Sequence, residues 1–284
     1  MIRLIGIFTG LFFAVAALWA FATGAYTAAT EGLGEETAEH AFHKYPKDLH
    51  LASDGVFGKW DLNQLQRGYQ VYKEVCSACH SMKFVAFRNL SELGYNEDEV
   101  KAEAANWQVP GIDPNTGEAT TRPGLPTDYF PSPYPNNVAA AAANNNAIPP
   151  DLSLITKARH DGSAYVYSLL TGYQGQPAKL LAEFPDSKTG PGLHYNPYFA
   201  NLNLAMAPPI TTAGQVSYAD GTDATVDQMS KDVSAFLTWT AEPTLVKRKQ
   251  TGFWFLGFLL FATVLAYFAK KQVWSSVKPA KRED

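Results

Sequence analysis

The chain has 284 residues, of which 46% are hydrophobic and 18% charged, and its formal net charge is −4. A chain of this length and apolar content can bury a substantial core in one large domain or two small ones. The weak negative charge, without a basic stripe, argues against a nucleic-acid partner.

An apolar segment forms the N-terminal end, from Leu4 to Ala29 after the single basic residue Arg3. A secretory signal has an apolar stretch of ~7–15 residues and a small-residue cleavage site, which the sequences at 22–24 and 27–29 can supply. The run found here is longer and can span a bilayer. Two interpretations stay open for residues 1–29, a signal sequence or a retained transmembrane anchor, and we expect residues 30–246 to lie outside the cytoplasm.

Four helices are predicted between the two ends of the chain, from apolar residues at helical spacing and from helix start and stop signals. No strand-rich region is apparent, so a mostly α-helical domain is expected. The segments and their expected cap or stop residues are 61–75 with Asp61 and Gln64, 96–105 with Asn96 and Glu99, 163–172 with Ser163 and Gly172, and about 225–240, ended by Pro243.

The stretch VCSACHS, residues 75–81, contains both cysteines of the chain. A Cys-x-x-Cys pair can be a redox dithiol, half of a zinc site or the anchor of a c-type haem. A thioredoxin-like dithiol would follow a strand, and zinc would need a second pair of Cys or His ligands, but a helix precedes the motif and the other histidines are scattered. We therefore predict one covalently bound haem c, with thioethers to Cys76 and Cys79 and with His80 as an axial ligand of the iron.

The segment between Val109 and Leu152 is rich in proline, asparagine and glycine and is expected to be irregular. A long irregular segment in a compact domain is usually functional or disordered. Its aromatic residues (Tyr129, Phe130 and Tyr134) favour packing against another group. We expect this segment to wrap the haem.

The second axial ligand is expected to be Met206, on a loop that the prolines after it stiffen. Met82 is too close to His80 along the chain to reach the opposite face, and Met229 falls on the apolar face of the last predicted helix. A thioether ligand favours ferrous iron and raises the reduction potential. His160 and His194 remain weaker candidates.

A second apolar segment, Thr251–Ala269, carries no charge and has about the ~20 residues that a bilayer requires. The larger excess of basic residues follows it, which predicts a transmembrane helix at 250–270 and a cytoplasmic tail at 271–284. The flanking basic residues are Lys247, Arg248 and Lys249 before the segment, and Lys270, Lys271, Lys278, Lys281 and Arg282 after it.

Several motifs together resemble the cytochrome c1 family, the c-haem subunits of the quinol–cytochrome c reductase (bc1) complex. The resemblance covers roughly residues 58–278. Its motifs are QLQRGYQVYKEVCSACHS, DYFPSPYPN, AIPPDLSLITKARH, YVYSLLTGY, AMAPPI and VSAFLTWTAEP, followed by one C-terminal anchor. Some bacterial members carry an additional disulfide near the methionine ligand, and this chain lacks the cysteines for it.

The resemblance implies a class I cytochrome c-like haem domain in which the first and last helices cross beside the haem. It implies roles for three more residues. Arg159, which taken alone is more often a solvated side chain, would pair with a haem propionate, Tyr165 would lie near the haem, and the backbone carbonyl of Pro150 would orient the His80 ring.

The implied function is electron transfer within quinol–cytochrome c reductase, without a bond-making active site in this chain. Electrons would pass from the Rieske iron–sulfur protein through the haem to a cytochrome c, in a dimeric complex that includes a cytochrome b subunit. The implied location is the bacterial inner membrane, with the haem domain periplasmic. The alternative is a free-standing membrane-anchored cytochrome that shuttles electrons.

Two acidic regions could steer a basic partner, or could be ordinary solvated faces and caps. They are the stretch 96–103 and the group Asp220, Asp223, Asp227 and Asp232.

Overall fold

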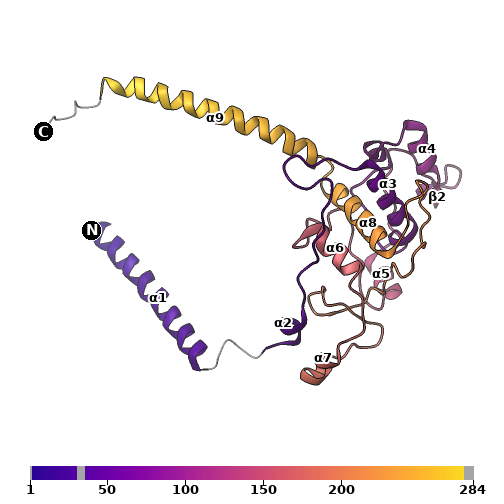
Figure 1. Ribbon diagram of the computed structural model, residues 1–284, viewed down its shortest axis with the longest axis horizontal. Helices are drawn as coiled ribbons and strands as arrows, with labels where there is room; N and C mark the ends of the chain where they lie inside the picture. The colour runs from indigo at the N-terminus through magenta and orange to yellow at the C-terminus, as the bar shows by residue number, and fades with distance from the viewer. Residues whose placement is uncertain (1, 31–35, 278–284) are drawn as a thin grey trace. The chain divides into compact units, whose positions relative to one another are not determined.

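The computed structural model describes residues 2–30 and 36–277, and the chain divides into two compact units. The smaller unit comprises residues 1–43 and 176–188, and the larger comprises residues 44–175 and 189–284 (Figure 1). The predicted basic residues Lys278, Lys281 and Arg282 lie outside the described residues.

In its described residues, the smaller unit contains one long helix and three short ones. Its ring pairs there are Phe12 with Phe13, with centroids 5.6 Å apart, and Phe42 with Phe184, with centroids 6.1 Å apart. Its elements are α1 (Ile2–Thr30), α2 (Ala38–Phe42), α7 (Ala178–Glu183) and the 3₁₀ turn η3 (Pro185–Ser187).

The larger unit is mostly helical, which confirms the predicted fold class. Two short antiparallel hairpins, β1–β2 and β3–β4, are the sheets in the described part of this unit. Its helices are α3 (Leu62–Val71), the π-helical turn η1 (Tyr72–Cys76), the 3₁₀ helix η2 (Phe87–Leu93), α4 (Glu97–Ala105), α5 (Asn137–Ala143), α6 (Gly162–Leu170), α8 (Val226–Ala241) and α9 (Leu245–Ser275). Its strands are β1 (Gln108–Ile112), β2 (Ala119–Pro123), β3 (His194–Tyr195) and β4 (Asn203–Leu204).

Three of the four predicted helix starts are confirmed by their caps. The Asp61 carboxylate accepts a hydrogen bond from Gln64 N at 3.1 Å, and Asn96 and Glu99 form a complete capping box. Thr225 caps α8 through Gln228 N at 3.0 Å. At α3 the capping box is only half formed, because the Gln64 side chain binds a residue of α8 instead.

Two local predictions are wrong. The segment predicted to be irregular contains the β1–β2 hairpin and helix α5. The helix expected to be capped by Ser163 begins at Gly162, preceded by Asp161 in a left-handed conformation with φ 60° and no side-chain cap. Backbone geometry rather than a side chain therefore starts α6.

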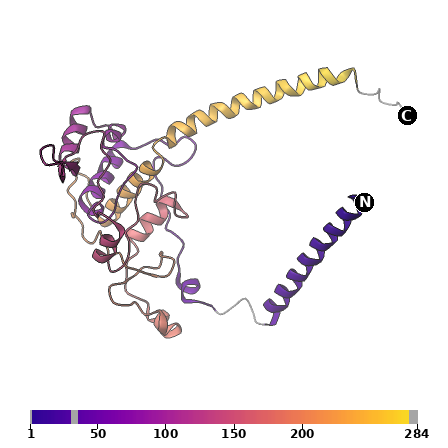
Figure 2. The ribbon, with the colours of Figure 1, turned by 180° about the vertical axis from the view of Figure 1, so that it is seen from behind.

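Helices α3 and α8 lie side by side in both ribbon views, as expected for the first and last helices of the domain (Figures 1 and 2). Gly68 lies at their crossing, where an added Cβ would overlap the carbonyl oxygen of Asp232 and press on Phe236. The absence of a side chain at Gly68 thus allows the two backbones to approach closely.

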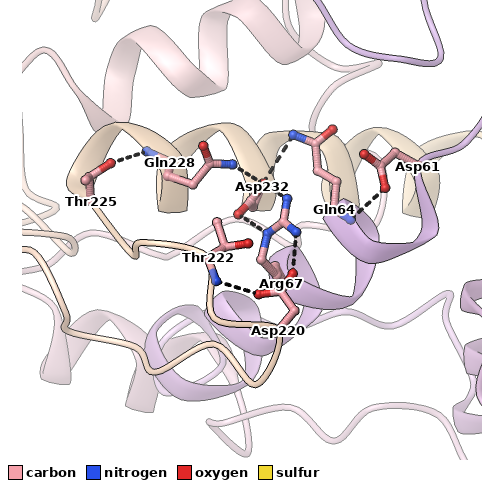
Figure 3. Close-up of polar contacts among 8 residues, drawn as sticks. All are labelled: Asp61, Gln64, Arg67, Asp220, Thr222, Thr225, Gln228 and Asp232. Carbon is pink, nitrogen blue, oxygen red and sulfur yellow. Dashed lines mark hydrogen bonds and ion pairs between the residues drawn. The ribbon is translucent and has the colours of Figure 1, made fainter.

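A charged network ties the same two helices together (Figure 3). Asp232 on α8 is fully buried, with 0% exposed side chain, and accepts hydrogen bonds from Arg67 Nε at 2.9 Å. Gln64 and Gln228 donate their amide groups to the same carboxylate at 3.2 and 2.8 Å. Arg67 also reaches Asp220 at 2.7 Å. The charge of Asp232 is therefore both paired and hydrogen-bonded, which buried charges require.

A cluster of aromatic rings continues this core towards the rest of the larger unit. Phe130 packs against Phe87 at 4.5 Å, Trp107 at 5.2 Å and Tyr69 at 5.9 Å between ring centroids. Tyr69 contacts Phe236 of α8 at 5.6 Å. Phe130, in the segment expected to wrap the haem, packs inside the protein core.

Two of the described helices, α1 and α9, are long and apolar enough to cross a membrane, with mean hydropathies of 2.3 and 2.0. No side chain of either helix's most apolar 18-residue window is buried. Since an apolar helix in a water-soluble core would be covered, an apolar surface on every side suits a lipid environment.

Candidate functional site

The Cys-x-x-Cys-His motif begins at Cys76, the last residue of the π-helical turn that follows helix α3. Residues 72–76 form this turn, and Ser77 N donates to the Tyr72 carbonyl at 2.8 Å. The amides of Cys79 and His80 then both donate to the Cys76 carbonyl, at 3.1 and 2.9 Å. The widened turn reverses the chain directly after the helix, and such π-turns are frequent at functional sites.

The ring of His80 is held by a single hydrogen bond. His80 Nδ1 lies 2.8 Å from the carbonyl oxygen of Pro150. Because a carbonyl can only accept, Nδ1 carries the proton and Nε2 keeps its lone pair free. Burial lowers the pKa of His80, although the Pro150 carbonyl opposes this shift. The side chain is thus a neutral imidazole with Nε2 available as a metal ligand.

The Pro150 carbonyl is fixed by its neighbour Asp151. One carboxylate oxygen of Asp151 accepts from Ser81 Oγ at 2.8 Å and from Lys83 N at 2.9 Å, and the other accepts from Ser153 N at 3.0 Å. These donors hold the pKa of Asp151 below its ordinary value, although burial opposes the shift. Leu152 N also donates to the Ser81 carbonyl at 2.9 Å. The two segments that carry His80 and Pro150 are therefore joined along their length.

The cysteine environment does not favour the zinc or redox interpretations. Burial raises the pKa of the Cys76 thiol to about 12, with a further contribution from Cys79. Metal binding and disulfide exchange use the thiolate, which a raised pKa disfavours. In the described part of the chain, no group of three or more His, Cys, Asp or Glu side chains is placed to bind a metal ion.

Among the described residues, the buried hydroxyl of Tyr72 lacks a hydrogen-bond partner. The Tyr72 hydroxyl interacts electrostatically with Cys76 and Asp151, so it lies near both the motif and the Pro150 segment. A buried polar atom without a partner is uncommon in proteins and suits a site that receives a bound group.

Met206 lies just after strand β4, and its backbone carbonyl accepts a hydrogen bond from the Tyr173 hydroxyl at 3.0 Å. Burial raises the pKa of Tyr173, with a contribution from Tyr165. Burial also raises the pKa of Tyr165, whose hydroxyl is hydrogen-bonded to Arg159. A chain of interactions therefore links Met206 to Tyr173, Tyr173 to Tyr165, and Tyr165 to Arg159.

The predicted site residues thus fall into two groups in the larger unit. Cys76, Cys79, His80 and Pro150 form one group, and Arg159, Tyr165 and Met206 form the other. Sequence reasoning overlooked two residues that support them, Asp151 and Tyr173. A proline-flanked acidic residue in PPDLS was the available signal for Asp151.

Three of the four aspartates in the second acidic region, Asp220, Asp227 and Asp232, have partners within the chain. Asp232 is fully buried, so it cannot belong to a docking surface. Asp220 is paired with Arg67, and Asp227 accepts from the Tyr167 hydroxyl at 2.5 Å and from Lys231 at 2.7 Å.

Comparison with known proteins decides the family. Residues 51–277 match the model of the Cytochrome C1 family. The chain belongs to the cytochrome c1 family. The match covers the larger unit from the loop before α3 through α9, and so includes both groups of site residues.

Named relatives are similar over most of the chain. Cytochrome c1 of Rhodospirillum rubrum is 46% identical over 233 residues, covering 79% of this chain and 85% of the relative. The protein "cytochrome c1-2, heme protein, mitochondrial" of Solanum tuberosum is 46% identical over 227 residues, covering 80% of this chain and 84% of the relative. Cytochrome b/c1 of Bradyrhizobium diazoefficiens is 45% identical over 236 residues, covering 78% of this chain and 34% of that longer protein.

Proposed function

We propose that this cytochrome c1 family member is the electron-transfer subunit of a quinol–cytochrome c reductase and carries one covalently bound haem c. The observation that carries the proposal is the His80–Pro150 hydrogen bond directly after a Cys-x-x-Cys pair. That bond leaves Nε2 of a neutral imidazole free as an axial ligand. The Solanum relative's name describes a haem protein, which supports the same cofactor here.

Each group of site residues has a role in this proposal. Cys76 and Cys79 would hold the porphyrin through thioethers, His80 and Met206 would ligate the iron, and Arg159 with Tyr165 would bind a propionate. When bound, the haem accepts and releases one electron. The Asp151 contacts keep the Pro150 carbonyl on His80, and the Tyr173 hydroxyl holds the backbone at Met206.

The proposed electron path runs from a Rieske iron–sulfur protein, through this chain, to a cytochrome c. A cytochrome b subunit is the expected membrane partner, in a dimeric complex, and the name of the Bradyrhizobium relative, cytochrome b/c1, supports that association. The chain itself would supply the haem environment and docking surfaces, without bond-making chemistry.

The proposed membrane arrangement uses the two apolar helices. Helix α9 would anchor the chain, with residues 30–246 on the periplasmic side of a bacterial inner membrane and the tail from 271 onwards in the cytoplasm. Helix α1 would be a signal sequence or a second anchor. In the sequence, five basic residues follow the apolar run and three precede it, which supports this orientation.

Co-purification from native membranes tests the function. A tagged chain is extracted in mild detergent, reduced-minus-oxidised spectra are recorded, and quinol-to-cytochrome c activity is assayed. The expected result is a c-type haem together with b-type haem, an iron–sulfur subunit and inhibitor-sensitive turnover. A c-type haem without b-type haem or turnover would instead favour a free-standing membrane-anchored shuttle.

A further inference from the structure

An apolar loop tip lies beside the start of helix α9. Residues 51–59 form a tight loop before α3, and its tip carries Val56 and Phe57 with 58% and 79% of their surface exposed. Neither side chain belongs to the core of the larger unit. Two adjacent exposed apolar side chains on a loop tip suit contact with an apolar surface.

The loop is held rigidly. Asp54 N donates to the Leu51 carbonyl at 2.9 Å, and the Asp54 carboxylate accepts from Leu51 N at 2.8 Å. Lys59 N closes the loop by donating to the Ala52 carbonyl at 2.8 Å. At Gly58 an added Cβ would overlap the Ser53 carbonyl, so the loop can close this tightly only with glycine there. Its shape is therefore determined by its own backbone.

The same loop is attached to the first turns of α9. Lys249 Nζ donates to the carbonyls of Ser53 and Gly55, at 2.9 and 2.8 Å. The Phe57 ring packs edge-on against Phe253, with centroids 5.9 Å apart, and Phe253 contacts Trp254 at 6.0 Å. Two polar contacts and one ring contact thus fix the loop tip against the helix.

These contacts fix the position of the loop tip along the axis of α9. The uncharged run Thr251–Ala269 of α9 begins two residues after Lys249, the last of the basic residues 247–249. Phe253 is the third residue of that run, about 3 Å along the axis at ~1.5 Å per residue. Phe57 therefore lies at the level where the helix passes from basic residues to apolar ones. Aromatic side chains are enriched at this level of membrane proteins, between headgroups and acyl chains.

We propose that the tip of the 51–59 loop, Val56 and Phe57, inserts into the lipid interface as a second membrane contact of the haem domain. The occupant is lipid because the tip continues the apolar surface of a helix that is itself apolar on every side. Two contact points with the membrane, α9 and the loop tip, would restrict the tilt of the domain. The inference rests on the proposed membrane insertion of α9.

Carbene labelling of the full-length, haem-loaded protein in vesicles of phosphatidylcholine and phosphatidylglycerol tests the proposal. A diazirine reagent that partitions into the acyl region is photolysed, and labelled peptides are mapped by mass spectrometry. The expected result is label on the peptide with Val56 and Phe57 and on the peptide with Phe253. The peptide with Ile112, a residue 74% exposed on strand β1, serves as the control and should remain at background. Background labelling at residues 56–57 would overturn the proposal.

A cysteine pair provides an independent measurement. In the same vesicles, Phe57→Cys should react with a membrane-impermeant maleimide at least about tenfold more slowly than Ile112→Cys, because apolar surroundings raise the pKa of a thiol and only the thiolate reacts. Equal rates would contradict lipid insertion.

Two controls in the same samples test the assumptions on which the loop proposal and the proposed function rest, namely membrane insertion of α9 and covalent attachment of the haem. An unlabelled Phe253 peptide would refute the membrane insertion of α9 and the loop proposal with it. Maleimide uptake by the wild-type chain, whose cysteines should be consumed by haem, would refute the covalent haem and leave the labelling result at residues 56–57 valid.

Discussion

Asp151 is surrounded by hydrogen-bond donors only. Ser81 Oγ, Lys83 N and Ser153 N all point at its two carboxylate oxygens. The residue before it supplies the carbonyl that orients His80. A carboxylate suits this position because every partner donates, and an amide of the same shape would turn two hydrogens towards those donors.

Asp151→Asn is therefore expected to destabilise the haem-loaded protein by about 1–3 kcal/mol, the usual cost of leaving buried polar groups unsatisfied. The measurement is the urea unfolding midpoint, followed by haem absorbance and by tryptophan fluorescence. Asp113→Asn is a matched control, because Asp113 also accepts backbone hydrogen bonds, from Asn115 at 2.7 Å and Thr116 at 3.3 Å, but in the β1–β2 turn. Equal midpoints for the two variants would contradict the role given to Asp151.

Met206 is the proposed second axial ligand. Replacing it with leucine keeps the apolar volume and removes the sulfur, so the thioether can no longer favour ferrous iron. The haem potential should fall by about 100 mV or more, a modest part of the ~0.8 V over which axial ligands set haem potentials. Met229→Leu is the control, since Met229 is fully buried on α8. A spectroelectrochemical titration in which Met206→Leu keeps the wild-type potential would eliminate Met206 as a ligand.

At the scale of elements, the α3–α8 crossing depends on one buried charge. Asp232 is paired with Arg67, which is itself only 14% exposed. Removing one partner of a buried pair costs more than the pair contributes, because the remaining charge stays desolvated. Asp220, the other partner of Arg67, is 37% exposed and can be hydrated when unpaired.

Arg67→Leu is expected to destabilise the protein by about 3–5 kcal/mol, because the buried Asp232 then keeps uncharged donors alone, among them the amides of Gln64 and Gln228. The double variant Arg67→Leu, Asp232→Leu should recover much of the loss, since it buries no unpaired charge. Asp220→Asn should leave the thermal midpoint close to that of the wild type. Thermal melts of the four proteins in one detergent provide the comparison. A double variant as unstable as Arg67→Leu would show that packing at the crossing, rather than charge, governs it.

Sequence patterns predicted the helices whose signals are local. Asp61, the Asn96–Glu99 pair and the apolar residues of α8 each lie within a few positions of the structure they specify. The β1–β2 hairpin was missed because Pro110, Pro114 and Pro123 look like loop residues. In a two-stranded hairpin, however, each strand has a free edge that tolerates proline.

The candidate site divides in the same way. The Cys76, Cys79 and His80 motif was readable because its ligands are adjacent. The contact of Tyr173 with Met206 could not be predicted, because it joins residues 33 positions apart. The same holds outside the site for the Arg67–Asp232 pair, whose members are 165 positions apart. Such contacts arise from packing between elements, which no local pattern in one sequence reports.

At the scale of the whole molecule, many carboxylates are stabilised in their ionised form. Hydrogen bonds and ion pairs lower the pKa values of six carboxylates in the described part of the larger unit, namely Glu103, Asp128, Asp151, Asp220, Asp227 and Glu242. A carboxylate whose pKa is lowered by folding stabilises the folded state above its unfolded pKa. That stabilisation is lost as the pH falls through the folded-state pKa. Folding stability should therefore decline in acid, at pH values below about 4.5.

Glu103 is one of these six carboxylates, and its contribution to folding stability can be measured separately. It joins α4 to α3, accepting from the Tyr69 hydroxyl at 2.6 Å, from Trp107 Nε1 at 3.1 Å and from Lys73 Nζ at 2.8 Å. Burial alone would raise the pKa of Glu103, but these hydrogen bonds outweigh it and lower the pKa. Because folding lowers the pKa of Glu103, its ionised carboxylate stabilises the folded state fully above the ordinary pKa of 4.5. This stabilisation is lost progressively as the pH falls from there through the folded-state pKa.

Glu103→Gln should therefore cost about 1–3 kcal/mol at pH 7, and the difference from the wild type should shrink as the pH falls below 4.5, because protonation of this carboxylate in the unfolded chain then favours unfolding of the wild type alone. Urea unfolding at several pH values measures the difference directly. Glu118→Gln, an exposed position at the β1–β2 hairpin, controls for the loss of one negative charge from a chain of net charge −4. If the gap between Glu103→Gln and the wild type stayed constant from pH 7 to pH 3, the cost would come from altered packing of the amide. The ionised carboxylate would then contribute nothing to the attachment of α4, and the acid sensitivity of the fold would have to arise from the other carboxylates.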